Sequence, residues 1–271
     1  MKNKILLAPV LMAALLAGCA ASKPEGELTG TVGTLYNDGM DNLQSKKYPQ
    51  AVHNFEELER QYPYSGWATR GQIMTAYAQL MNDDHDESIS TIERFVKMHP
   101  GHKDLPYMYY LAGLNHYYQM TDVNRDQSET QKALDAFNEV VNRFPQSPFA
   151  RDAKLKITLC HDHLAGKEMT VGRYYQKQKL HLAAINRFRN VVQNYQTSSQ
   201  TPEALYRLTE SYISLGVNDE AVRAAAILGY NYPGSSWYAQ AYDLLTARQL
   251  APAGQKESWA KRLSKGFADL F

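Results

Sequence analysis

Cysteine is scarce in this sequence, and the short motifs on which most enzymes depend are missing. Only Cys19 and Cys160 occur among 271 residues. There is no glycine-rich phosphate loop, no serine or cysteine nucleophile motif and no Cys-x2-Cys pair. Nothing marks an acidic pair such as Glu56-Glu57 as a proton donor beside a charged base. We therefore expect no catalytic site and no cofactor.

A metal site is not expected either, although His161-Asp162-His163 looks like a ligand cluster. Side chains two positions apart on a helix diverge by about 200°. The two imidazoles therefore cannot share one ion without help from elsewhere. Cys160 lies beside this cluster on an apolar helical stretch that includes Leu155 and Leu159. We interpret it as a buried thiol and not as a nucleophile.

Charge of one sign is not in excess, because 29 basic residues face 28 acidic ones for a net charge of +1. A nucleic-acid-binding surface needs a basic stripe, so we expect no nucleic-acid partner. Phenylalanine is also uncommon, with 8 residues against 19 tyrosines. Tyrosine combines a large apolar ring with a hydroxyl that can stay hydrated. This bias favours a surface that is partly core and partly contact face.

The sequence has no apolar run long enough to span a membrane comfortably. The run at residues 5–16 is shorter than the roughly 20 residues that a spanning helix needs. Preceded by Lys2 and Lys4, it has the form of a secretion signal. It ends in Leu16-Ala17-Gly18-Cys19, which resembles the bacterial lipobox. Residues 1–18 would then be a lipoprotein signal peptide; an ordinary signal peptide or a core helix with a chance cysteine is the alternative.

The lipobox resemblance implies that Cys19 is lipidated and begins the mature chain. Several acyl chains on one residue form a stable membrane anchor, whereas one chain binds only marginally. Ala20 stands where aspartate would retain such a lipoprotein in the inner membrane, so the outer membrane is implied. Residues 19–32 are mostly small and polar and are interpreted as a lipidated flexible tether.

An eleven-residue pattern recurs five times along the rest of the chain. Each copy begins with a small residue and continues with mostly apolar residues four and seven positions later. Four of the five copies end in a tyrosine, phenylalanine or histidine that is followed by proline. Positions 0, 4, 7 and 11 lie on one face of a helix, and proline prevents the helix from continuing. The terminal rings are those of Tyr62, His99, Phe144, Tyr195 and Tyr232.

This pattern resembles the second helix of a tetratricopeptide repeat, and Gly39 fits the small position on the first helix. We therefore predict an all-α fold, a tetratricopeptide-type solenoid of about five helical hairpins plus a capping helix, wound as an elongated right-handed superhelix. First helices are predicted at 33–46, 66–82, 103–120, 149–178 and 200–216. Second helices are predicted at 48–62, 85–99, 129–144, 181–195 and 218–231, and the capping helix at 236–250. The predicted ends of the second helices are followed by Ser65, Gly101-His102, Ser147, Ser198-Ser199 and Ser235-Ser236, most of which are predicted N-caps of the next helix.

Two intervals between the repeats are longer than the others. One contains a polar stretch at 121–130, which indicates an inserted loop. The other contains residues 149–178, which we interpret as one long helix, or two nearly collinear ones, projecting beyond the stack. Residues 251–271, in which Pro252 and Gly254 break the last helix, form a basic amphipathic tail that would dock on a partner, lie on a membrane or pack back onto the last hairpin.

Concave solenoid surfaces are lined mainly by first helices, where tyrosine is concentrated. Tyr77, Tyr107 and Tyr110 are therefore candidates for a groove that binds an extended peptide, although packing between repeats explains such residues equally well. Tyr62 joins them through the family resemblance described next.

Lipobox, tether and stretched repeats together resemble the BamD (ComL/YfiO) family of outer-membrane lipoproteins. The strings that carry the resemblance are residues 60–65, 122–127, 168–175 and 184–188. The resemblance implies a periplasmic protein anchored in the outer membrane. Its implied partners are the periplasmic repeat domains of the β-barrel assembly protein, other Bam lipoproteins and unfolded outer-membrane proteins.

The resemblance also implies a division of labour within the chain. The N-terminal repeats, residues 33–145, would receive substrate through Tyr62 and the Tyr77 face. The C-terminal repeats, residues 146–250, would hold the assembly protein through Arg173, Arg187 and Arg189. The rival functions are a repeat lipoprotein that coordinates peptidoglycan synthesis or cell division, and an envelope enzyme with a separate catalytic domain.

Overall fold

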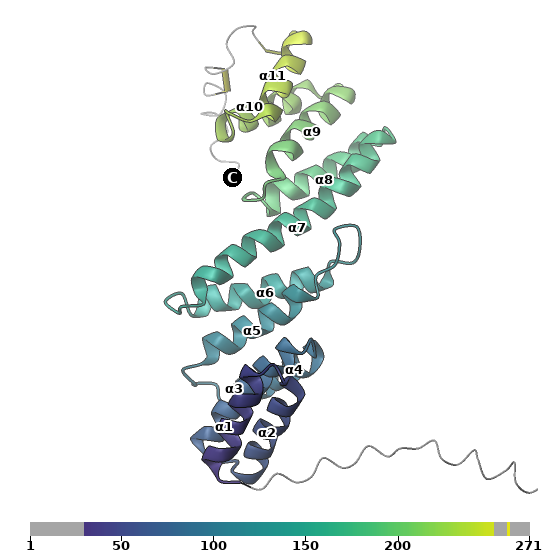
Figure 1. The fold of residues 1–271 in the computed structure, drawn as a ribbon. Helices are drawn as coiled ribbons and strands as arrows, with labels where there is room; N and C mark the ends of the chain where they lie inside the picture. Colours follow the sequence, from purple (N-terminus) through teal and green to yellow (C-terminus); the bar gives the residue numbers. More distant parts are fainter. Residues whose placement is uncertain (1–29, 252–258, 261–271) are drawn as a thin grey trace, which may run out of the picture. The chain divides into compact units, whose positions relative to one another are not determined.

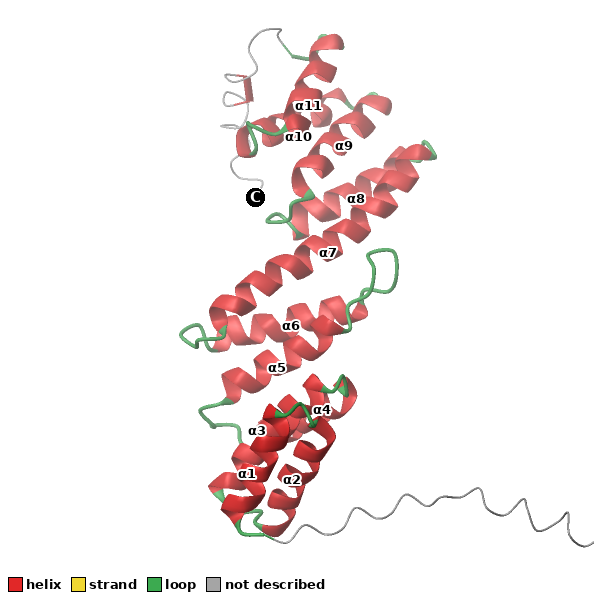
Figure 2. Cartoon of the chain, in the orientation of Figure 1, coloured by secondary structure: helices red, strands yellow, loops and turns green. Residues whose placement is uncertain are grey.

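The computed structural model describes residues 30–251 and 259–260, and every regular element in them is an α-helix (Figures 1 and 2). The signal peptide, Cys19 and most of the tether and tail lie outside the described residues. The helices are α1 Val32–Gln44, α2 Tyr48–Gln61, α3 Gly66–Met81, α4 His85–Met98, α5 Leu105–Tyr118, α6 Ser128–Arg143, α7 Ala150–Lys177, α8 His181–Asn194, α9 Thr201–Ser214, α10 Asn218–Asn231 and α11 Ser236–Ala247.

The chain divides into two compact units, with the boundary inside α3 between Gln72 and Ile73. In the first unit α1 and α2 form a hairpin around fully buried Phe55. A Cβ on Gly39 would lie 2.5 Å from Cε1 of Phe55, so the bare backbone of α1 makes room for this ring. Asn42 donates a hydrogen bond to Asn54 at 3.0 Å and closes the hairpin on its polar side.

The second unit contains the rest of α3 and all later helices, packed around three clusters of buried apolar side chains. One joins α3, α4 and α5, the next joins α5, α6 and α7, and the third extends from α7 to α11. Trp259 and Ala260 belong to the third cluster, so this part of the tail packs back onto the last hairpin. The described residues thus have the predicted all-α, tetratricopeptide-type fold of consecutive helical hairpins.

Helix α7 is continuous over 28 residues, which decides between the two predicted alternatives. The prediction that it projects beyond the stack is wrong. Its first half packs on α6 through Ala153 and Cys160, and its second half packs on α8 through Met169. One helix therefore belongs to two neighbouring cores, because buried residues continue at helical spacing along its whole length.

One turn is repeated after each second helix. The backbone N–H three residues after the terminal ring donates to the carbonyl of the ring residue at 2.9–3.0 Å in all five cases. Ser65 and Ser235 then accept hydrogen bonds from the next helix, as predicted. The predicted caps Ser147 and Ser198 instead remain inside the turn, because α7 and α9 begin three residues after them.

Four of the five turns inside the hairpins, all except the α5–α6 connection, contain a residue in the left-handed conformation. Lys46, Asp83, Lys179 and Gly216 have φ between 57° and 76°. The N–H of the following residue donates back across the last helical turn, for example from Leu180 to the carbonyl of Tyr175 at 2.9 Å. This arrangement is a Schellman motif, in which the left-handed residue is usually glycine.

The predicted insertion is a loop between α5 and α6, and it is fastened to α7. His163 bonds through Nε2 to the carbonyl of Thr121 at 2.7 Å, and Lys167 donates to the carbonyl of Asn124 at 2.8 Å. Val123 packs over Gly166 between these two bonds. The loop therefore connects the third hairpin to the middle of the long helix.

Candidate functional site

Aromatic side chains from α5 gather where this helix faces α7. The ring of Tyr110 stacks on Phe149 with centroids 5.3 Å apart, and its hydroxyl donates a hydrogen bond to Asp152. The ring of Tyr107 lies 5.1 Å from the same phenylalanine. Two of the four tyrosine candidates therefore share one neighbour. We call the surface formed by Tyr77, Tyr107, Tyr110, Tyr117, Asp152 and Lys156 the tyrosine face.

Burial changes the acidity of these hydroxyls. It raises the pKa of Tyr107 to about 12, and the nearby phenol of Tyr77 contributes to the same shift. The pKa of Tyr110 is also raised, first by burial and then by its bond to the Asp152 carboxylate. Both hydroxyls therefore stay protonated at neutral pH. The face offers uncharged rings that are half-buried and hydroxyls that can exchange hydrogen bonds with a ligand.

Asp152 and Lys156 on α7 are the charged members of the tyrosine face, and neither was predicted from the sequence. Lys156 Nζ lies 4.8 Å from the ring centre of Tyr117 and 3.6 Å from Asp152 Oδ2. The first contact has cation–π geometry. Asp152 and Lys156 are four residues apart and so project from one side of α7. That spacing was visible in the sequence, but their aromatic partners on α5 were not.

The candidate Tyr62 lies in the other compact unit. Its hydroxyl donates to the carbonyl of Gly30 at 3.0 Å, and its backbone ends α2. Tyr62 therefore fixes the start of the described chain onto the first hairpin. This contact gives Tyr62 a packing role inside its own unit.

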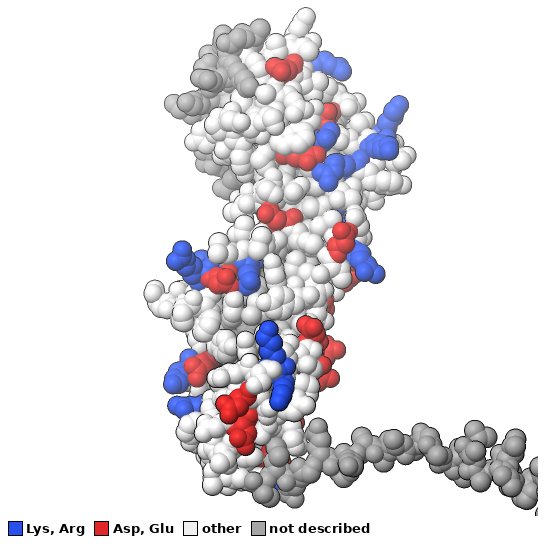
Figure 3. Space-filling model, viewed as in Figure 1, with Lys and Arg blue, Asp and Glu red and all other residues white. Residues whose placement is uncertain are grey.

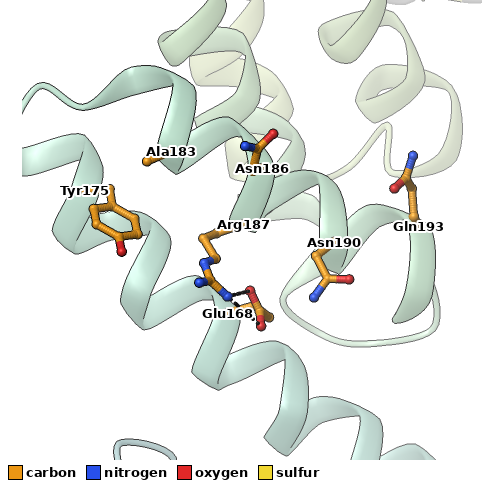
Figure 4. A pocket seen from close by; sticks show the side chains of 7 residues that line it. All are labelled: Glu168, Tyr175, Ala183, Asn186, Arg187, Asn190 and Gln193. Carbon is orange, nitrogen blue, oxygen red and sulfur yellow. Dashed lines mark hydrogen bonds and ion pairs between the residues drawn. The ribbon is translucent and has the colours of Figure 1, made fainter.

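Arg187 lines an open groove of about 450 Å³ between α7 and α8 (Figure 4). Its guanidinium Nη1 contacts the two carboxylate oxygens of Glu168 at 3.3 and 3.4 Å. The Arg187 side chain is 44% exposed, while that of Glu168 is 16% exposed. The guanidinium of Arg187 therefore faces solvent, and it is held by the less exposed carboxylate of Glu168. Glu168 was not among the residues predicted from the sequence. The groove is also lined by Tyr175, Ala183, Asn186, Asn190 and Gln193.

The other two arginine candidates are not part of this groove lining. Arg173 Nη1 bonds Glu203 on α9 at 3.1 Å. Glu203 also pairs with Arg207, which packs over the rings of Tyr206 and Trp237. Arg189 is exposed on α8, and its charge acts on Tyr212 of α9. The three predicted arginines therefore lie in three different surroundings.

The histidine cluster singled out in the sequence is used for packing. His161 lies edge-on to the ring of Tyr195, Asp162 accepts a hydrogen bond from the backbone of Ser199, and His163 holds the inserted loop. Among the described residues no group of three or more histidine, cysteine, aspartate or glutamate side chains could hold a metal ion. Cys160 is fully buried, and burial raises the pKa of its thiol to about 11.

Charges of both signs are interspersed on the face drawn in Figure 3, without a broad area of one sign. Within residues 30–251 and 259–260, no helix is both long and apolar enough to cross a membrane.

Comparison with known proteins places the chain in a family. A family model described as YfiO, outer membrane lipoprotein, matches residues 29–228. An outer membrane protein assembly factor BamD from Caulobacter vibrioides is 45% identical, over 92% of this chain and 83% of the relative. The chain belongs to the BamD family. The BamD relative from Rickettsia prowazekii is 42% identical, over 90% of this chain and 97% of its own length.

Among solved structures, the chain is similar to the TPR2AB domain of yeast Sti1 in its pHSP90 complex. The TM-score is 0.42 at 10% identity, covering 88% of this chain and 85% of that one. It is also similar to the type IV pilus biogenesis factor PilW, with a TM-score of 0.36 at 14% identity over 79% and 99% of the two chains.

Proposed function

We propose that this protein is a non-catalytic scaffold of the outer-membrane β-barrel assembly (Bam) complex, anchored through Cys19 on the periplasmic face of the outer membrane. Membership of the BamD family supports the assembly role, because its relatives are named outer membrane protein assembly factors. The lipobox-like sequence before Cys19 supports the anchor. Peptidoglycan coordination, the rival function, has no comparable support.

The proposed binding of the assembly protein rests on one observation, which is that the guanidinium of Arg187 is half-exposed in an open groove. Asn186, Asn190 and Gln193 line the same groove, and their amides can donate and accept hydrogen bonds. Such a wall suits an irregular or extended segment whose backbone needs hydrogen-bonding partners. We assign this groove to the periplasmic repeat domains of the barrel-forming assembly protein, with Arg173 and Arg189 on the surrounding surface.

The tyrosine face is the proposed substrate side. A nascent outer-membrane protein presents amphipathic strands with alternating apolar and polar side chains. The half-buried rings of Tyr107 and Tyr110 suit the apolar side chains, while Asp152 and Lys156 suit the polar ones. Tyr77 extends this face along α3. Tyr62, in the first unit, remains a candidate through the family resemblance alone.

Site-specific photo-crosslinking in intact envelopes tests both assignments. A photoreactive residue replacing Asn190 should crosslink one barrel-forming assembly protein, and one replacing Tyr107 should crosslink newly made outer-membrane proteins. A photoreactive residue at exposed Asp243 on α11 is the matched control and should give neither product. Crosslinks from Asn190 only to cell-wall synthases or hydrolases would overturn the proposal.

A charge-reversing substitution distinguishes a specific role of the Arg187 groove in binding from a general effect of surface charge. Arg187→Glu should weaken the complex with the assembly protein by at least tenfold, because it places a second carboxylate beside Glu168. Lys154→Glu changes the net charge equally on an exposed part of α7 and should have little effect. Equal losses in both variants would show that the groove is not the binding site.

A further inference from the structure

A second groove, lined by none of the residues assigned above to a substrate or partner, lies between α4 and α6 with α5 as its floor. It encloses about 430 Å³. Its apolar lining comes from Ile92 and Val96 of α4, Tyr109 and Ala112 of α5, and Ala136 of α6. We call it the α4–α6 groove. All of its lining lies within the second compact unit.

The floor of the groove offers little to a polar backbone. Its one hydroxyl, on Tyr109, is already bonded to Arg143 at 2.7 Å. An extended peptide laid here would leave its N–H and C=O groups without partners, which is costly when they are buried. A helix satisfies its own backbone groups. The small side chains of Ala112 and Ala136 also allow the close approach that helix packing needs.

Carboxylates form the rim of the groove. Glu93 and Asp135 are exposed on opposite walls, and neither has a cationic partner in the described part of the chain. Glu139 also lines the groove and pairs with Arg143 at 3.2 Å. Lys97 is the only basic residue of the lining. With Arg143 counted beside Glu139, three carboxylates face two cations, and the unpaired carboxylates of Glu93 and Asp135 leave a formal excess of one negative charge around the apolar floor.

We propose that the α4–α6 groove binds an amphipathic helix of a partner protein, with its apolar stripe on the floor and lysine or arginine residues beside the rim. Apolar anchors at i, i+3, i+4 and i+7 are the usual way in which a helix lies in such a groove. The lining residues of α4 and those of α6 each span little more than one helical turn. We therefore expect the partner helix to contact the groove over about two of its own turns. This mode differs from that of the amide-lined Arg187 groove, which suits an extended segment.

A defined peptide probe tests the proposal with the mature chain carrying Cys19→Ser. The probe is a labelled 15-residue helix of about two heptads, with leucine at i, i+3, i+4 and i+7 and lysine elsewhere. Fluorescence anisotropy should show saturable binding of one peptide per chain. Glu93→Lys/Asp135→Lys should weaken binding at least tenfold. Ala136→Trp, which fills the groove, should weaken it similarly while the circular dichroism and thermal unfolding remain those of the parent chain.

The matched control is Glu87→Lys/Asp243→Lys, which makes the same charge change at exposed positions away from the groove. It should change the affinity less than twofold. Equal weakening by both double variants, or equal binding of a scrambled peptide without an apolar stripe, would overturn the proposal. So would unchanged binding to the Ala136→Trp variant. If the chain instead forms a dimer that Ala136→Trp dissociates, the groove is a self-interface and the proposed partner is wrong.

Discussion

A Cβ placed on Gly172 of α7 would lie 2.5 Å from Cε1 of Phe188 on α8, so this ring fills the space that a side chain would need. The same relationship joins Gly113 to Phe137 and Gly39 to Phe55. In three hairpins, therefore, a glycine on the first helix and a phenylalanine on the second form one packing unit. A glycine inside a helix is normally unfavourable, and here close packing offsets that cost.

Gly172→Ala should destabilise the protein despite the better helix propensity of alanine. Overpacking a buried site typically costs about 1–3 kcal/mol, and alanine returns about 1 kcal/mol in propensity. Gly166→Ala is the matched control on the same helix, because its new Cβ would meet only Val123 at an ordinary 3.4 Å. Chemical denaturation should give a lower free energy of unfolding for Gly172→Ala and an equal or higher one for Gly166→Ala. A lower free energy of unfolding for Gly166→Ala than for Gly172→Ala would show that Gly172 and Phe188 do not form such a packing unit.

Lys179→Gly should stabilise the turn between α7 and α8. Lys179 has φ 61°, a left-handed conformation that costs an L-residue about 1–2 kcal/mol. Glycine avoids that cost but loses more backbone entropy on folding, so a net gain of about 0.5 kcal/mol is expected. The neighbouring Gln178 has φ −80°, and Gln178→Gly should therefore destabilise. Thermal unfolding of both variants checks the prediction, and stabilisation by Gln178→Gly alone would contradict it.

The thiol of Cys160 should be unreactive in the folded protein. It is fully buried and its pKa is raised to about 11, against about 8.5 for a free thiol. At pH 8 it is both protonated and inaccessible. With Cys19 replaced by serine, Ellman's reagent should label Cys160 only after addition of denaturant. Labelling of the native protein at the rate of the unfolded one would place Cys160 at the surface.

Stability should decrease at alkaline pH partly because of Tyr107. Its folded pKa of about 12 exceeds the unfolded value of about 10. The contribution is therefore complete below pH 10 and is lost as the pH rises from 10 to 12. Tyr107→Phe should make the unfolding free energy less dependent on pH in this range. An unchanged pH dependence in Tyr107→Phe would contradict the prediction.

The helices were predictable to within a few residues because two local signals coincide in each repeat. The spacing from Ala51 to Tyr62 defines a helix face, and Pro63 ends the helix, as its counterparts do in three other repeats. The left-handed turns were not predictable, because Lys46, Asp83 and Lys179 are not residue types that identify them.

The candidate sites were only partly predictable, because they depend on pairs from different helices. Arg187 was predicted through the family resemblance, but its partner Glu168 lies one helix earlier and was not predicted. Tyr110 was likewise predicted as a groove residue without its hydrogen-bond partner Asp152. Spacing within one helix indicates which residues share a face, whereas the helix that this face meets is set by tertiary packing.

Affinity purification from native envelopes tests the assembly-scaffold function most directly. The full-length protein, tagged after Phe271, would be extracted in detergent in parental and Arg187→Glu forms, and co-purifying proteins would be quantified by mass spectrometry. The parental form should recover a barrel-forming outer-membrane protein with periplasmic repeats in equal amounts, and Arg187→Glu should lose most of it. Recovery of only cell-wall synthases or hydrolases by the parental form would contradict the account.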